Sequence, residues 1–180
     1  MRTRYKIPDY KASCFITSTI IDWIPVFNES KYFEILIDAI KYNQQHKDFE
    51  VFAYVIMVNH FHMICRSDNL SNIFRSIKSY TAKKIIEKLK ADGKLNLLNM
   101  FEENKRKGKK VSQYQIWQEG FMPKEILSEK MFNQKLLYIH YNPVEAGIVD
   151  NPQDYEYSSA FDYYWAKTGK LKLDCVEYER

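Results

Sequence analysis

The chain has 180 residues, of which 46% are hydrophobic, and its 27 lysines and arginines exceed its 23 aspartates and glutamates by a formal net charge of +4. This balance predicts one globular domain with a substantial core and excludes a disordered chain, and no apolar run is long enough to span a membrane. The N-terminus lacks the apolar centre of a signal peptide, and an odd number of widely spaced cysteines (Cys14, Cys65, Cys175) favours reduced thiols in a cytoplasmic protein.

The first third of the chain predicts three strands and a helix. Residues 13–21 are rich in β-branched side chains and predict a strand. Ser30 is expected to cap a helix, because apolar residues follow it at helical spacing. Residues 49–58 and 61–65 are apolar runs separated by the turn residue Asn59, so they predict two strands joined by a tight turn.

The middle of the chain predicts a helix and then a basic segment. The helix is expected to begin at Asn69 or Ser71 and to end at Gly93, a residue type common just after a helix. Residues 91–112 are expected to form a basic insertion or loop. The local excess of lysine and arginine suits a polyanion such as nucleic acid, although a solvated helix face explains the charge equally well.

The last third predicts a fourth strand over 114–121 and a third helix. Ser128 is expected to cap this helix, which should run to about Tyr141 and stop at Pro143. We expect a single domain over residues 1–165, followed by a C-terminal tail over 166–180.

The order of these elements predicts an α+β fold. Strand, helix, two strands, helix, strand and helix follow one another, which is the ferredoxin-like split βαβ arrangement. The expected structure is a four-stranded antiparallel sheet with helices on one face. Such a fold hosts many functions and does not by itself identify one.

His60 and His62 are the most informative residues of the chain. They flank Phe61 at the end of an apolar run, and there are only four histidines in all. Alternate residues of a strand share a face, so both imidazoles should project side by side while Phe61 points into the core. This pattern indicates a metal site or an acid–base pair. The alternative is two structural histidines, each of which would need its own hydrogen-bond partners.

Zinc bound by the two histidines and Cys65 is a rival interpretation. On a regular strand residue 65 falls on the opposite face from residues 60 and 62. A structural zinc site also normally needs a fourth ligand, and none is evident nearby. Both points disfavour zinc.

Tyr138 and Asn142 are the second notable pair. Four residues separate them in the predicted third helix, so they should share a face about a quarter turn from its apolar stripe. Asn142 precedes Pro143 and is expected to be the last helical residue or to lie just outside, because a residue before proline avoids the helical conformation. Taken alone, a tyrosine in such a position is usually a packing residue.

Together these motifs resemble a known family. His60-Phe61-His62 at a strand end, followed by a tyrosine, an asparagine and Pro143-Val144, is similar to the single-tyrosine HUH transposases, named for histidine, hydrophobic residue, histidine. The REP-associated tyrosine transposases, relatives of insertion-sequence transposases, are the most similar branch. Trp117-Gln118 and Tyr157-Ser158-Ser159 add to the resemblance, which covers residues 13–160.

The resemblance implies a role for each matched residue. Tyr138 would be the nucleophile, and His60, His62 and Asn142 would hold Mg²⁺ or Mn²⁺. The enzyme would nick and rejoin single-stranded DNA through a 5′-phosphotyrosine intermediate, an HUH endonuclease activity on an RRM-like sheet. Val58, Tyr141 and the long segment 95–110 depart from the family pattern, and the last of these leaves the DNA target open.

The implied partner is single-stranded or hairpin DNA, from REP-like repeats or insertion-sequence ends. Arg75, Lys78, Lys83 and Lys84 are candidates for contacts with its backbone. The protein is expected to act as a monomer or homodimer in the bacterial cytoplasm, associated with the nucleoid when bound, without a membrane.

Three other functions stay open. One is a domesticated protein that binds hairpin DNA with weak or no cleavage. Another is a metal-dependent hydrolase that uses water, which the lack of an evident carboxylate base near the histidines disfavours. The last is a non-catalytic module.

Overall fold

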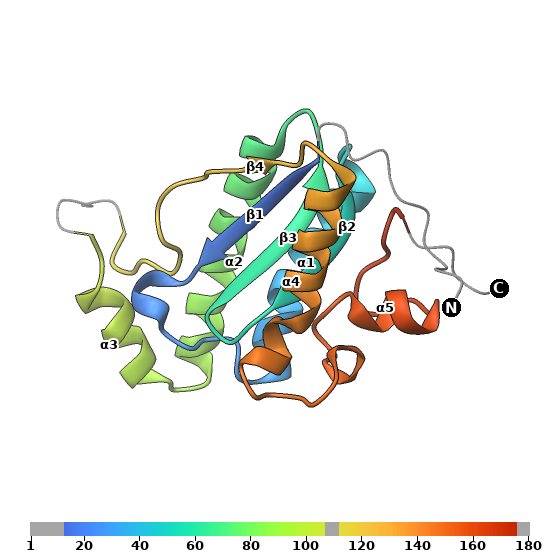
Figure 1. Cartoon of the computed structure of the whole chain (residues 1–180). Coiled ribbons are helices and arrows are strands. Elements are labelled where there is room, and N and C mark those ends of the chain that lie inside the picture. Colours follow the sequence, from blue (N-terminus) through green and yellow to red (C-terminus); the bar gives the residue numbers. More distant parts are fainter. Residues whose placement is uncertain (1–12, 107–111, 176–180) are drawn as a thin grey trace.

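A central antiparallel sheet organises the molecule (Figure 1). The computed structural model describes residues 13–106 and 112–175. The strand order is β2-β3-β1-β4, which is the ferredoxin-like order, so the predicted α+β class and four-stranded antiparallel sheet are confirmed. The strands are β1 (Cys14–Thr19), β2 (Glu50–Ile56), β3 (His60–Arg66) and β4 (Lys124–Glu125).

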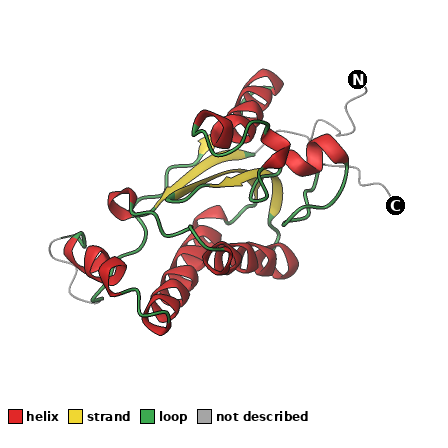
Figure 2. Ribbon diagram, turned by 90° about the horizontal axis from the view of Figure 1, so that it is seen from below, coloured by secondary structure: helices red, strands yellow, loops and turns green. Residues whose placement is uncertain are grey.

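Helices cover both faces of this sheet, as Figure 2 shows, and this corrects the expectation of helices on one face. Helices α1 (Ser30–His46) and α2 (Leu70–Ala91) lie on one face, and α4 (Glu129–Glu145) crosses the other. Phe61 stacks on Phe74 of α2, whereas its neighbour His62 lies against Tyr138 of α4. The side chains of β2 and β3 are buried along nearly the whole length of both strands, which requires cover on both faces of the sheet.

The segment expected as a basic loop contains a helix. Helix α3 (Leu95–Glu103) follows α2 after a turn at Gly93, whose φ is +65°. Leu98 and Phe101 are buried, and they lie three residues apart on the same side of the helix. Their burial stabilises a helix that local charge alone did not predict. The expected loop otherwise includes residues 107–111, which lie outside the described part of the chain.

The fourth strand does not lie where the sequence predicts it. Within the predicted strand 114–121, Trp117 makes only an isolated bridge to Ile20, and β4 forms further on, opposite the start of β1. The indole of Trp117 is buried and donates to Thr81 at 3.0 Å. The ammonium of Lys78 donates to the carbonyl oxygens of Gln118 and Gly120 at 3.2 and 3.3 Å. These side-chain bonds replace the pairing that a regular strand would provide.

Helix α4 continues through Pro143, which corrects the expected stop. Proline removes one intrahelical hydrogen bond, but its fixed φ remains compatible with a final helical turn. That turn is closed by hydrogen bonds from the Ala146 N–H to the Asn142 carbonyl (3.0 Å) and from the Ile148 N–H to the Pro143 carbonyl (2.9 Å). Asn142 is therefore inside the helix, and Gly147, at φ +68°, ends it.

The C-terminal part packs on the same core. It contains the short helix α5 (Ala160–Trp165) and the 3₁₀ turn η2 (Pro152–Asp154). Leu171 and Leu173 of the expected tail are buried, and the Asp174 N–H donates to the Val51 carbonyl at 2.9 Å. Within residues 13–106 and 112–175, no helix combines the length and apolar character needed to cross a membrane.

Candidate active site

The site lies on the face of the sheet that α4 covers. The register of β1 and β3 sets Thr17 opposite His62 and Thr19 opposite His60. The two imidazoles lie on the same face of β3, with their ring centroids 4.9 Å apart. The strand alternation that predicted this side-by-side placement is present because β3 pairs regularly with β1 over the whole segment.

His62 contacts side chains of both β1 and α4. Its side chain is buried, and its ring stacks on Phe15 at a centroid distance of 5.4 Å. Nδ1 lies 2.8 Å from the Thr17 hydroxyl oxygen, and Nε2 lies 3.4 Å from the Tyr138 hydroxyl oxygen. Burial, helped by the nearby charges of His60 and Lys135, lowers the pKa of His62 to about 3. The imidazole is therefore neutral at physiological pH, which is the form that binds a metal or accepts a proton.

His60 has a different pair of partners. Its Nδ1 donates to the Asn59 side-chain oxygen at 2.7 Å, because an amide oxygen can only accept. This leaves the lone pair on Nε2. Burial lowers the pKa of the His60 imidazole, and a hydrogen bond with the Asn142 side chain of α4 opposes this shift in part. Asn142 thus reaches the histidine pair from the helix, as its position four residues after Tyr138 predicted.

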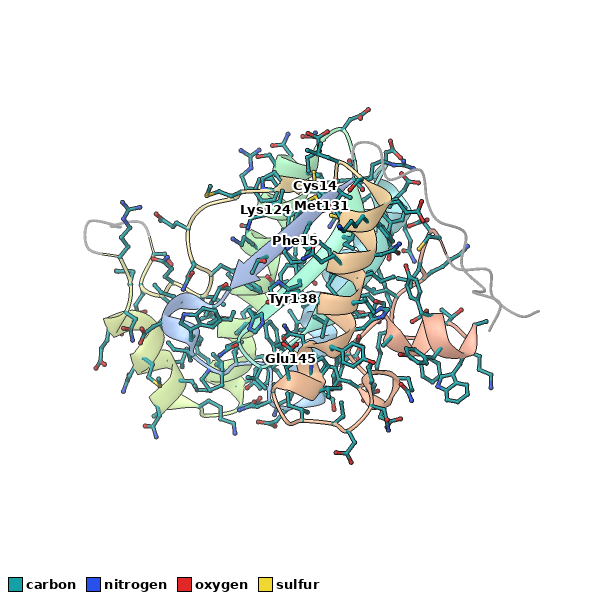
Figure 3. All side chains as sticks on the ribbon, in the orientation of Figure 1. Cys14, Phe15, Lys124, Met131, Tyr138 and Glu145 are labelled. Atoms are coloured by element: carbon teal, nitrogen blue, oxygen red, sulfur yellow. The ribbon has the colours of Figure 1, made fainter. Side chains whose placement is uncertain are left out.

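Tyr138 lies on the side of α4 that faces β1 and β3 (Figure 3). The residue is 42% exposed, so Tyr138 contacts His62 through its hydroxyl and still keeps part of its surface in solvent. The ring edge packs against Phe15 at a centroid distance of 6.0 Å. This geometry suits a nucleophile, because the oxygen is held at the histidines and can still be reached by a large substrate.

Lys135 is a site residue that the sequence interpretation missed. Its ammonium lies 4.7 Å from the ring centroid of Phe15 and 5.8 Å from that of Tyr138. Both contacts are in the range of cation–π attraction, so the lysine is held above the site. One signal was available: Lys135 precedes Tyr138 by three residues on the same helix, a spacing that brings side chains together. Thr17 gave no such signal, because its contact depends on strand register.

Two imidazole nitrogens and one amide oxygen are suitable ligands for a divalent cation that completes its coordination with other oxygen ligands. His60 and His62 both engage Nδ1 with an oxygen, which is the pattern that orients a ligating histidine and directs Nε2 to a metal. The Asn142 amide oxygen is the third candidate ligand. Within residues 13–106 and 112–175, no group of three or more histidine, cysteine or acidic side chains could hold a metal ion, so a site here would need the Asn142 amide beside the two histidines. This set therefore does not resemble structural zinc.

The four basic candidates on α2 lie across the sheet from the histidines. Arg75, Lys78 and Lys83 line an open groove of about 810 Å³ between α2 and residues 112–121. Lys84 is not among its lining residues and binds Glu87 at 2.9 Å. Burial lowers the pKa of Lys78, whose ammonium already binds two carbonyls. The structure therefore brings three of these cations together, but not beside Tyr138.

Helix α4 is tied to the sheet by a buried polar contact. The Ser159 hydroxyl donates to the Tyr54 carbonyl at 3.1 Å and accepts from the Tyr54 N–H at 3.0 Å. Its oxygen also lies 3.0 Å from His140 Nε2, which can donate the third bond. His140 is two residues from Tyr138. The Tyr-Ser-Ser motif thus has a structural role, since Ser159 joins the tyrosine helix to the outer strand β2.

Two known proteins are similar to this chain, one in sequence and one in fold. No protein-family model matches the chain. A Haemophilus influenzae protein that carries the name REP-associated tyrosine transposase is 27% identical over 121 residues, which cover 67% of this chain and 64% of that protein. The match thus spans slightly less than two thirds of that relative's length.

A solved structure of a REP-associated tyrosine transposase bound to a REP hairpin matches with a TM-score of 0.62 and 21% identity, over 100% of this chain and 98% of that one. At this identity the structural likeness shows a shared fold. The predicted resemblance to REP-associated tyrosine transposases is therefore confirmed by one relative in sequence and by another in fold.

Proposed function

We propose that this chain, similar in sequence and fold to REP-associated tyrosine transposases, is an enzyme that nicks and rejoins single-stranded DNA through Tyr138. One observation carries the proposal: the Tyr138 hydroxyl oxygen is 3.4 Å from His62 Nε2, in a group that also contains His60, Asn142 and Lys135. A structural tyrosine would have no need of one buried and one half-buried neutral histidine and a lysine around a partly exposed side chain.

The chemistry follows from these groups. The Tyr138 oxygen attacks the phosphorus of a phosphodiester, a 5′-phosphotyrosine bond forms, and the departing oxygen leaves as a 3′-OH. Attack by another 3′-OH reverses the step and restores a phosphodiester, so neither ATP nor water is consumed. Lys135, whose ammonium lies 5.8 Å from the Tyr138 ring centroid, supplies positive charge near the tyrosine as negative charge develops on the phosphate.

His60, His62 and Asn142 are the proposed ligands of Mg²⁺ or Mn²⁺. Such an ion, when bound, would polarise a phosphate oxygen and stabilise charge in the transition state. Thr17 and Asn59 orient the two histidines through their Nδ1 atoms, at 2.8 and 2.7 Å. Neutral imidazoles are required for this role, and the lowered pKa values of both histidines favour that form.

The proposed substrate is hairpin DNA with a single-stranded flank, from REP-like repeats or insertion-sequence ends. Support comes from the REP hairpin bound in the solved transposase structure and from the basic groove of Arg75, Lys78 and Lys83. Lysine and arginine side chains there can follow a phosphate backbone. We propose that the protein works in the bacterial cytoplasm as a monomer or homodimer.

Tyr138→Phe tests the nucleophile. Labelled hairpin oligonucleotides are incubated with Mg²⁺ or Mn²⁺, and products are separated under denaturing conditions. Tyr141→Phe is the matched control, because Tyr141 lies on the same helix and is also 42% exposed. We expect a metal-dependent covalent protein–DNA adduct with the parent chain and with Tyr141→Phe, and none with Tyr138→Phe.

Two other outcomes would contradict the proposal. Cleavage without an adduct that survives in Tyr138→Phe would identify water as the nucleophile. Tight hairpin binding without cleavage of any hairpin carrying the recognised sequence would identify a domesticated hairpin-binding protein instead.

A further inference from the structure

The short connection between β1 and α1 exposes a tryptophan in a strained conformation. Within the turn η1 (Ile21–Trp23), Asp22 and Trp23 have φ values of +50° and +56°. Positive φ is disfavoured for residues with a side chain and is an outlier for a bulky one. Ile20 and Ile24 on either side are buried, yet Trp23 is 56% exposed. The fold therefore holds a large aromatic ring in solvent, where it contributes little to the core.

Backbone hydrogen bonds hold both ends of the turn η1. The Trp23 N–H donates to the Ile20 carbonyl at 3.1 Å, and the Ile24 N–H donates to the Ile21 carbonyl at 3.2 Å. The Ile20 N–H in turn donates to the Asn59 carbonyl at 2.8 Å, which joins the turn to the residue before the histidine pair. These bonds select one backbone conformation for the turn and hence one direction for the Cα–Cβ bond of Trp23.

Asn59 links this tryptophan directly to the site. Its side-chain nitrogen donates to the Trp23 carbonyl at 3.0 Å, while its side-chain oxygen accepts from His60 Nδ1 at 2.7 Å. The edge of one ring meets the face of the other between Trp23 and His60, with centroids 5.6 Å apart. One amide thus positions both the histidine and the tryptophan, so the exposed indole is fixed at the border of the candidate active site.

We propose that the Trp23 indole is a stacking platform for an unpaired base of the nucleotide beside the scissile phosphate. This inference rests on the proposed single-strand cleavage. Aromatic side chains bind single strands by stacking, with little dependence on base identity, because every base has a π face. The exposed carboxylate of Asp22 repels phosphate, so the turn is suited to a base rather than to the backbone. The substrate must therefore present an unpaired base at the cut.

The test measures binding and not cleavage. All proteins carry Tyr138→Phe, and their affinity is measured by fluorescence anisotropy for a short labelled oligothymidylate and for an abasic strand of the same length. Trp23→Ala is compared with Trp23→Phe. Trp165→Ala is the matched control, because Trp165 is 53% exposed and lies on α5, on the other side of α4 from η1 (Figure 1).

We expect Trp23→Ala to weaken oligothymidylate binding about 10-fold, with partial recovery in Trp23→Phe and no loss in Trp165→Ala. Binding of the abasic strand should be the same in all four proteins. Equal weakening for both strands would show that Trp23 acts through folding or charge, and unchanged oligothymidylate affinity would also overturn the inference. The binding measurements do not depend on nucleophile chemistry, whereas the covalent adduct tests the proposed function. Failure of the stacking role and failure of the cleavage chemistry can therefore be told apart.

Discussion

Acidification should lower the free energy of unfolding through His140, which joins α4 to the sheet. This residue is buried, only 4% exposed, and its Nε2 lies 3.0 Å from the Ser159 hydroxyl. Burial lowers the pKa of His140 from 6.5 to about 3. In the unfolded chain the imidazole takes up a proton near pH 6.5, whereas in the folded protein it stays neutral. The contribution of neutral His140 to the free energy of unfolding is therefore fully present above pH 6.5. It is lost progressively as the pH falls towards 3.

The size of the effect follows from proton linkage. Each pH unit between the two pKa values costs about 1.4 kcal/mol, so the descent from pH 7 to pH 5 should remove about 2 kcal/mol of unfolding free energy through His140. His62 also has a lowered pKa and contributes to the total. Urea unfolding of the parent chain and of His140→Gln is measured at pH 7 and at pH 5. The comparison separates the His140 contribution from that of His62, because the His62 contribution is common to both proteins.

We expect the variant to be less stable at pH 7 but to lose about 2 kcal/mol less than the parent chain on acidification. The physical reason is that glutamine has no proton to take up. An equal loss in both proteins would refute the reasoning, since it would mean that His140 titrates in the folded state as it does in the unfolded one. A greater loss in the variant would contradict the sign of the pKa shift.

Three further predictions concern the site and the core. Thr17→Val removes the hydroxyl that lies 2.8 Å from His62 Nδ1 and should raise the metal concentration needed for half-maximal cleavage about 10- to 100-fold. An unchanged metal dependence would contradict the orienting role of Thr17. Lys135→Gln should slow adduct formation at least about 10-fold in single-turnover assays, while Lys135→Arg should retain most of the activity. Equal rates for the parent chain and Lys135→Gln would exclude a role for the charge. Phe101→Ala should cost about 3–5 kcal/mol in urea unfolding because the ring is fully buried, and a loss below about 1 kcal/mol would mean that α3 packs loosely.

Much of the fold could be predicted from local patterns. The apolar runs of β2 and β3 and the apolar spacing of α1 and α2 predicted these elements to within a few residues. Ser128, whose side chain accepts from the Met131 N–H at 3.1 Å, was correctly predicted as the N-cap of α4. These signals succeed because strand alternation, helix periodicity and capping depend on residues close together in sequence.

Other elements depended on partners far along the chain. The burial of Phe101 made a helix of a segment whose charge predicted a loop, and Lys78 bound the backbone of residues 118–120 where a strand was expected. Pro143 remained within α4 because the helix has other bonds for its last turn. In the first two cases a contact between distant segments outweighed the local preference, whereas the bonds that close the helix after Pro143 are local.

The sequence by itself determined that His60 and His62 share one face of a strand and that Tyr138 and Asn142 share one side of a helix, because both relations follow from the repeat of a single element. Only the tertiary structure decided that α4 covers the histidine face and that Thr17 orients His62. These pairings depend on strand register and on which face of the sheet each helix buries. Both are set by long-range packing between apolar surfaces, which no local pattern specifies.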